Sequence, residues 1–275
     1  MKLTVLADNI PHPKNPKLLA KHGFAVHVEF NGFQMLYDFG PEGVLIPNAS
    51  VLGIDLSEVN IAVLSHGHHD HSGGLGGFLE INDIAKVRHG RGAFQPRWNV
   101  ADGPARDIGV QLPGFEDMVD RFSAVDKLVE MKDFIILPAA PGYRGKPDGN
   151  SSLLAGRAGE RLQDDFTDEL TVALRGEDGL VVMTGCSHRG VVNIIDQVKA
   201  YCPNCPIAAL IGGFHLFDEK ESQENLERVV SELVTEIPET RVLAGHCTES
   251  KAAEMLSDAF GERFSRIHTG FVTTY

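Results

Sequence analysis

The sequence has no apolar run near the roughly 20 residues that a membrane-spanning helix needs, and it has no excess of positive charge. Its 275 residues carry 38 acidic and 25 basic side chains, which gives a net charge of −13. A surface with this balance is a poor partner for nucleic acid or for an anionic membrane. We therefore expect neither as a partner and expect a small-molecule substrate.

Cysteine is also scarce, with four residues. The opening segment, Met1 to Asp8, reads as a short strand and not as a signal peptide, because Asp8 interrupts it before any cleavage-site pattern appears. We therefore expect a cytoplasmic protein whose cysteines are all thiols. The pair in Cys202-Pro203-Asn204-Cys205 has no second pair elsewhere, which favours a helix-to-strand turn over a zinc knuckle.

Hydrophobic residues make up 43% of the chain, enough for one continuous core. Ala25–Phe30 and Gln34–Phe39 alternate on either side of Asn31-Gly32, a strong hairpin signal. A second hairpin is expected from Leu170–Leu174 and Leu180–Thr184. Beyond it, strands are expected at 207–211, 241–244 and 266–272, and helices at 191–200, 222–235 and 251–259. Hairpins followed by alternating strands and helices predict two sheets with helices outside them, in a single domain over residues 1–275.

Residues 82–168 carry much of the proline and glycine and show little sustained periodicity. We interpret them as an insertion or lid with one clear strand, Phe134–Leu137. The first part of this segment is basic and free of acids from Ile84 to Ala101. Arginine suits phosphate through its planar fork; a solvated surface loop is the competing interpretation. The residues predicted to hold a substrate phosphate are Arg88, His89, Arg91 and Arg97.

A histidine-rich run directly follows Ile61–Leu64, whose wholly apolar sequence predicts a buried strand. Its residues His66, His68, Asp70 and His71 form the pattern His-x-His-x-Asp-His. Imidazole and carboxylate suit zinc, manganese or iron. Four such groups within six residues favour a metal site over a solvated histidine-rich loop.

Three distant histidines, His188, His215 and His246, each follow a predicted strand. Strand ends converge at one rim in α/β folds, where sites usually form. We therefore predict His188 and His246 as metal ligands. For His215 two roles stay possible: proton transfer beside the metal ligands, or a structural role.

The His-x-His-x-Asp-His run after a buried strand resembles the signature of the metallo-β-lactamase superfamily. Further segments are similar, in order and spacing, to the subgroup related to 7,8-dihydropterin-6-methyl-4-(β-D-ribofuranosyl)-aminobenzene-5′-phosphate synthase. These segments are Asp8-Asn9, His22-Gly23, Tyr37–Gly40, Ser65–Gly74, Asp168-Glu169, Gly185–Gly190, Gly212–Leu216 and Gly245–Thr248. The resemblance runs nearly end to end and is weakest across residues 82–168. It implies an α/β fold, the four-layer αββα sandwich, with two metal ions at its rim.

The resemblance also implies a ligand set. His66, His68 and a third histidine would hold one metal, and Asp70, His71 and His246 would hold the other. Asp38 matches the aspartate that supports the metal-binding loop by hydrogen bonds.

The chain departs from the superfamily pattern at the bridging aspartate, where Cys186 stands instead. The usual histidine upstream of the hairpin is also missing, so His188 is expected to supply the third imidazole. Cys186 is then either a thiolate ligand or a small packed residue. Asp168 or Glu169, just before the hairpin, is an alternative source of the carboxylate.

Together these features predict a metal-dependent hydrolase, or a related synthase, acting on a small phosphorylated or pterin-like substrate. The expected cofactor is two divalent metal ions, zinc first and manganese or iron as alternatives. His215 or Asp70 would handle the proton. Two other functions stay open: a di-iron redox or oxygen-handling protein, and a non-catalytic ligand sensor on the same fold.

Overall fold

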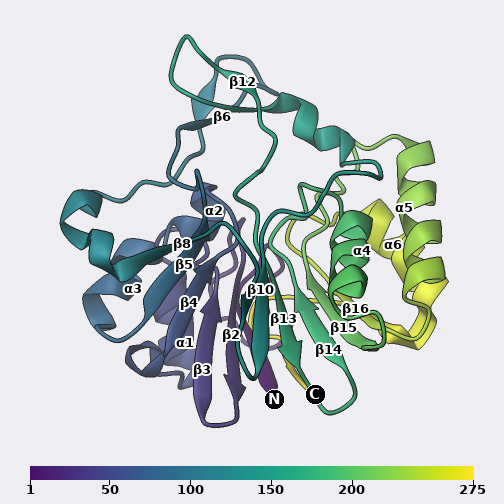
Figure 1. Ribbon diagram of the computed structural model, residues 1–275, viewed down its shortest axis with the longest axis horizontal. Helices are drawn as coiled ribbons and strands as arrows, with labels where there is room; N and C mark the ends of the chain where they lie inside the picture. The colour runs from purple at the N-terminus through teal and green to yellow at the C-terminus, as the bar shows by residue number, and fades with distance from the viewer.

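The computed structural model describes residues 1–275 and places two seven-stranded sheets face to face, with helices on both outer faces (Figure 1). The first sheet has the order β18-β1-β2-β3-β4-β5-β8 and the second β17-β16-β15-β14-β13-β10-β9. The strands of the first sheet are β1 (Lys2–Ala7), β2 (Ala25–Phe30), β3 (Phe33–Tyr37), β4 (Ile61–Leu64), β5 (Lys86–Gly90), β8 (Phe122–Val125) and β18 (Val272–Thr274). Those of the second are β9 (Val129–Glu130), β10 (Phe134–Leu137), β13 (Thr171–Arg175), β14 (Leu180–Met183), β15 (Ile207–Gly212), β16 (Arg241–Ala244) and β17 (Phe264–Arg266).

Three hydrophobic clusters hold these layers together. One lies between the sheets and contains side chains of both, such as Val63 and Val172. The outer clusters join each sheet to its helices. The helices are α1 (Leu45–Leu52) and α3 (Leu75–Ile81) on the first sheet and α4 (Val191–Tyr201), α5 (Gln223–Glu236) and α6 (Ser250–Phe260) on the second. The expected αββα sandwich is confirmed, and none of its helices is long and apolar enough to cross a membrane.

Both hairpin predictions are confirmed. Strands β2 and β3 pair antiparallel up to Phe30 and Phe33, around a turn whose Asn31 and Gly32 have φ of 50° and 74°. A two-residue turn with both φ values positive suits the right-handed twist of the strands, and Asn-Gly tolerates it best. Strands β13 and β14 form the second hairpin.

The segment 82–168 contains eight strands, and not the single strand expected from the sequence. Four of them, β5, β8, β9 and β10, complete the two main sheets. The other four form a small separate sheet of order β12-β11-β6-β7, which stands above the rim of the sandwich (Figure 1). Their bounds are β6 (Arg97–Asn99), β7 (Arg106–Asp107), β11 (Leu153–Ala155) and β12 (Leu162–Gln163). Strands of two or three residues are too short to show an alternating pattern. Their pairing partners also lie far along the chain, so no hairpin signal marks all of them.

The expected last strand, 266–272, is wrong. The structure divides it between β17, which pairs with β16 in the second sheet, and β18, which pairs with β1 in the first. Gly270, with φ of 78°, lies in the turn between them. The chain therefore crosses from one sheet to the other at its end.

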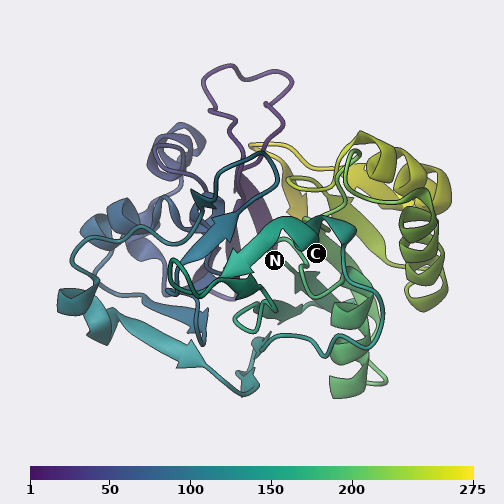
Figure 2. The same ribbon diagram turned by 90° about the horizontal axis from the view of Figure 1, so that it is seen from above.

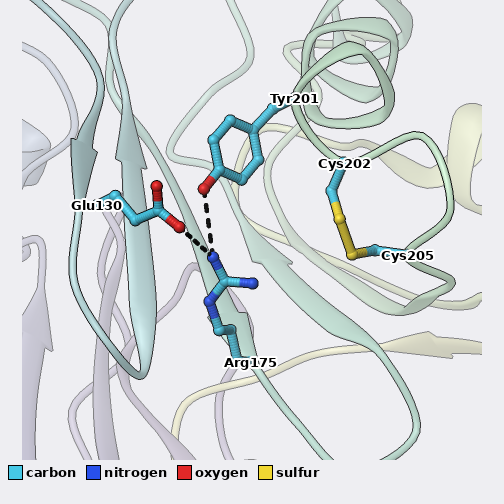
Figure 3. The surroundings of a disulfide bond; sticks show 5 residues. All are labelled: Glu130, Arg175, Tyr201, Cys202 and Cys205. Atoms are coloured by element: carbon cyan, nitrogen blue, oxygen red, sulfur yellow. Dashed lines mark hydrogen bonds and ion pairs between the residues drawn. A yellow bond between two sulfur atoms is a disulfide. The ribbon is translucent and has the colours of Figure 1, made fainter.

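The expectation that all cysteines are thiols is also wrong, because Cys202 and Cys205 form a disulfide (Figure 3). Their segment is the turn expected between helix α4 and strand β15. The turn brings the two Cα atoms within 5.4 Å, inside the range for a disulfide. The expected cellular compartment predicts only the usual redox state of cysteines, whereas the local backbone geometry decides whether two thiols can come together. Cys186 and Cys247 are free and buried.

Candidate metal centre

The predicted ligands meet at one rim of the sandwich, where four strands end. Strand β4 leads into the run from Ser65 to His71, and β14, β15 and β16 lead to His188, His215 and His246. Strands β14, β15 and β16 are parallel, so their carboxyl ends point the same way. Figure 2 views this rim from above, with the small sheet in front of it.

Site one consists of His66, His68 and His188. The Nε2 atom of His66 lies 3.1 Å from Nδ1 of His68 and 3.3 Å from Nε2 of His188. All three residues are buried, and burial lowers the pKa of each imidazole well below its ordinary value. Three neutral imidazoles thus face one another, as the sequence predicted.

Site two consists of Asp70, His71 and His246. The Nε2 atoms of the two histidines lie 3.1 Å apart, and Asp70 Oδ2 lies 3.6 Å from that of His71 and 3.3 Å from that of His246. Burial works to raise the pKa of Asp70, but His71 and the other neighbouring imidazoles outweigh it and hold that pKa well below the usual range. Site two therefore contains a carboxylate held in its charged form, whereas site one has imidazoles alone.

Cys186 lies between the two sites. Its Sγ is 3.1 Å from Nε2 of His71, and it groups with both His66 and His71 at a spacing that a metal ion could span. The alternative carboxylates are engaged elsewhere. Asp168 accepts the amide N–H of Gly67, and Glu169 accepts those of His188 and Arg189. Of these three residues, Cys186 is the one that groups with ligand candidates of both sites.

The outer nitrogens of three of the histidines face acceptors. His71 Nδ1 lies 2.7 Å from the Asp38 carboxylate, and His188 Nδ1 lies 2.9 Å from the amide oxygen of Asn150. His246 Nδ1 lies 3.0 Å from the amide oxygen of Asn9. In the neutral rings of His188 and His246 the outer nitrogen donates its proton, so the inner Nε2 presents a lone pair. Burial works to lower the pKa of His71, but the Asp38 and Asp70 carboxylates outweigh it and raise that pKa, so a cation at Nε2 of His71 would replace a proton.

Ring nitrogens 3.1 to 3.3 Å apart need a proton or a metal ion between them, because two facing lone pairs would repel. The donor chemistry of both sites therefore fits a cation, which this arrangement of imidazoles, carboxylate and thiol is suited to hold.

Asp38 supports the metal-binding loop as expected. Besides holding His71, its carboxylate accepts the N–H and the hydroxyl of Ser65, both at 2.7 Å. Two glycines let the loops approach so closely. A Cβ on Gly67 would lie 1.8 Å from the carbonyl oxygen of Ala93, and one on Gly185 would lie 2.2 Å from the Ser65 hydroxyl.

Backbone strain is concentrated around the centre. Six residues other than glycine have positive φ, and all except Asn31 lie at the rim. The five are Asp38, Phe166, Ser187, His215 and His246, with φ between 50° and 61°. Such conformations cost free energy and persist where the surrounding structure holds them.

His215 lies beside site one. Its ring centroid is 4.3 Å from that of His188 and 4.7 Å from that of Phe217. Burial, with a smaller contribution from the Lys220 charge, lowers its pKa to about 3. Its buried Nδ1 has no hydrogen-bond partner. A neutral imidazole with a free ring nitrogen is available to hydrogen-bond to a bound molecule, and its role stays a prediction.

The prediction that Arg97 binds substrate is wrong. Its guanidinium is fully buried and pairs with Asp164 at 2.8 Å and with Asp168 at 2.7 Å. Since Asp168 also accepts the N–H of Gly67, Arg97 braces the metal-binding loop from behind. A side chain enclosed by two carboxylates cannot reach a substrate.

The other basic residues of that stretch remain unassigned to the site. Arg91 is largely exposed and pairs with Asp126, and Arg88 donates to the hydroxyl of Ser123. His89 packs against Phe94, and its Nδ1 faces the Gly90 carbonyl. Their contribution to substrate binding stays a prediction.

Several residues of the centre gave no usable signal in the sequence. Asn9 and His22 reach site two from the loop after β1, and Asn150 reaches site one from the 3-10 helix Asp148–Ser152. Phe166 stacks on the His188 ring, with centroids 3.9 Å apart. In the sequence none of them belongs to a ligand motif, and only the likeness of the Asp8-Asn9 and His22-Gly23 segments to the subgroup pointed to two of them. In the structure His22 groups with Asp70 and His246 at a spacing that a metal ion could span.

Comparison with known proteins identifies the family of this chain. The chain is 28% identical to 7,8-dihydropterin-6-methyl-4-(beta-D-ribofuranosyl)-aminobenzene-5'-phosphate synthase of Methanocaldococcus jannaschii, over 100% of this chain and 97% of that protein. The crystal structure of Tm1679, a metal-dependent hydrolase of the beta-lactamase superfamily, is similar with a TM-score of 0.83 at 28% identity, covering 100% and 99% of the two chains. A diphosphatase from the PhnP family shares the fold, with a TM-score of 0.58 at 13% identity over 100% and 97%. A sequence profile of the metallo-beta-lactamase superfamily matches residues 21–193. The chain therefore belongs to the metallo-beta-lactamase superfamily.

Proposed function

We propose that this protein is a metal-dependent hydrolase, or a related synthase, that acts on a small phosphorylated or pterin-like substrate through two divalent metal ions. One observation carries the proposal. Sites one and two lie side by side, each with inner lone pairs set by outer hydrogen bonds, and Cys186 lies between them.

Each site would hold one metal ion. His66, His68 and His188 would bind the first, Asp70, His71 and His246 the second, and Cys186 would lie within reach of both. A thiolate among the ligands favours zinc, while manganese and iron also accept imidazole and carboxylate. When bound, such a pair of ions lowers the pKa of water and polarises a phosphoryl or carbonyl oxygen.

Proton transfer is assigned to His215 and not to Asp70. The Asp70 carboxylate is directed at His71 and His246, so its oxygens are committed to site two. His215 is neutral at neutral pH, since its pKa is lowered to about 3, first by burial. Its Nδ1 is free to accept a hydrogen bond from the reacting group. Because a pKa of about 3 makes the free ring a weak base, His215 would take up a proton only when a bound anion or developing charge raises that pKa.

A phosphorylated substrate is supported by the name of the relative in Methanocaldococcus jannaschii, whose product carries a 5'-phosphate. A basic residue close enough to act on His215 is Lys220, whose charge helps to lower the pKa of that histidine. Its ammonium lies 5.2 Å from the centroid of the Phe217 ring. We therefore place the anchor for a distal anion at Lys220, on the loop after β15, in place of Arg97.

The test is a substrate screen with metal control. The purified chain is stripped of metal, reconstituted with zinc, manganese or iron, and assayed on phosphomonoesters, phosphodiesters, neutral esters and lactones. Two equivalents of metal and turnover of a phosphorylated compound are the expected result. His215→Gln should lose kcat while it keeps both metals.

His12→Ala is the matched control, because it removes an imidazole outside the centre. Binding of fewer than two metals contradicts the dinuclear centre. Two bound metals with turnover of neutral compounds only contradicts the phosphate assignment. Iron-specific oxygen consumption without hydrolysis would replace the proposal by the redox alternative.

A further inference from the structure

The loop between β1 and β2 passes over site two and brings two polar side chains to it. In Figure 2 this loop projects at the top of the view as the purple segment. Asn9 opens the loop and His22 closes it. Neither is among the six residues that sites one and two comprise, yet each contacts a ligand of site two.

The orientation of the Asn9 amide is fixed by its partners. Its Nδ2 lies 3.0 Å from the carbonyl oxygen of His246, which can only accept a hydrogen bond. Its Oδ1 accepts the backbone N–H of Gly23 at 3.1 Å. A flipped amide would oppose donor to donor and acceptor to acceptor at once, so only one orientation satisfies both contacts.

This orientation determines the tautomers of two histidines. Asn9 Oδ1 lies 3.0 Å from His246 Nδ1, which must therefore carry the proton, and His246 Nε2 is left with its lone pair toward site two. The second proton of Asn9 Nδ2 points to His22 Nδ1, 3.1 Å away, which must accept it. His22 then carries its own proton on Nε2, 3.2 Å from Oδ2 of Asp70.

We propose that Asn9 and His22 are a positioning pair that presents Asp70 and His246 to the metal of site two. The proposal rests on the two-metal centre proposed above. Asp70 follows a strand of the first sheet and His246 one of the second. Asn9 and His22 connect them through one chain of hydrogen bonds, which sets the ligand directions and the lone pair of His246.

The pair affects the metal more than the fold. The side chain of His22 is 55% exposed, so its removal opens no cavity. Site one has no contact with either residue; its His188 is oriented by Asn150 instead. Loss of an outer hydrogen-bond partner typically weakens metal binding by roughly 10- to 100-fold. We therefore expect Asn9→Ala and His22→Ala to weaken site two by that factor and to leave site one unchanged.

The test separates the two sites by mutation and measures metal affinity by chelator competition. In a His68→Ala background, where site two alone is intact, adding Asn9→Ala or His22→Ala should lower affinity roughly 10- to 100-fold. In a His246→Ala background the same changes should have no effect. His22→Gln, whose amide can still donate to Asp70, should recover part of the loss.

His12→Ala, on the same loop but away from both sites, is the control and should leave both affinities at wild type. Thermal unfolding of the metal-free variants should match the wild type. Unchanged site-two affinity in Asn9→Ala and His22→Ala, with two metals bound by the wild type, overturns the positioning pair alone. Equal losses at both sites would also overturn it, and a wild type that binds fewer than two metals would overturn the dinuclear centre and the pair together.

Discussion

Sites one and two share a rim but differ in charge and in what covers them. Site one is made of three neutral imidazoles and is covered by the segment that also forms the small sheet, through Asn150 and Phe166. Site two contains the Asp70 carboxylate and is covered by the loop after β1, where His22 is half-exposed.

This difference shows that the two sites depend on different parts of the chain. An uncharged ligand set gives a cation no Coulombic compensation, so site one must rely on how its imidazoles are oriented. Site two adds the Asp70 carboxylate to two imidazoles. Each site can therefore be damaged separately, and the predictions below use that independence.

The largest effect is expected from removing one ligand of each site. His68→Ala and His246→Ala should each lose about one of two metal equivalents, and each should lose activity by more than the roughly 100-fold typical of an outer partner. Elemental analysis after dialysis, together with the substrate screen, measures both quantities. Wild-type metal content in both variants would refute the assignment of ligands to sites.

Arg97→Ala should damage site one and the fold together. It leaves Asp164 and Asp168 buried without their partner, and breaking a buried pair in this way costs about 3–5 kcal/mol of unfolding free energy. Denaturant unfolding measures the loss. Arg91→Ala, which removes an exposed arginine, is the matched control and should change stability by less than about 0.5 kcal/mol. Similar stabilities for the two variants would contradict the bracing role of Arg97.

Asn150→Ala is the counterpart at site one of Asn9→Ala at site two. It removes the acceptor of His188 Nδ1 and the donor to the His188 carbonyl. We expect roughly 10- to 100-fold weaker metal binding at site one in a His246→Ala background. An unchanged metal affinity of site one, or an equal loss of affinity at site two in a His68→Ala background, would contradict a role of Asn150 that is confined to site one.

The smallest effect is expected at Lys220. Lys220→Ala should raise KM for a phosphorylated substrate roughly tenfold, the factor that 1.4 kcal/mol represents, with kcat and both metals retained. Lys220→Arg should keep most of the binding. If neither variant changes KM for a phosphorylated substrate, Lys220 does not bind the anion, and Arg88 or Arg91 would be the next candidates.

Most of the candidate ligands could be identified from the sequence, because each lies in a short motif or directly after a recognisable strand. The His-x-His-x-Asp-His run follows an apolar strand, and His188 and His246 each follow another. The hairpin at Asn31-Gly32 was equally visible, since its two positive φ values restrict the residues that fit.

The sequence did not predict what depends on distant partners. Arg97 reads as an exposed phosphate binder until Asp164 and Asp168, more than 60 residues later, enclose it. Strand β6 is recognisable only when β11 pairs with it, Arg97 opposite Ala155. Asn9 and His22 have no periodicity at all, because the β1–β2 loop alone brings them over the rim.

The placement of the ligands also joins the two halves of the sandwich. His66, His68, Asp70 and His71 extend from the first sheet, whereas His188 and His246 extend from the second. Each site would thus act as a reversible cross-link between sheets, formed only in the folded chain. By mass action, free metal at about 1,000 times the dissociation constant would add about 4 kcal/mol to the unfolding free energy. Resistance to heat and to proteases should therefore rise with metal supply, so that the protein's lifetime reports the metal available to it.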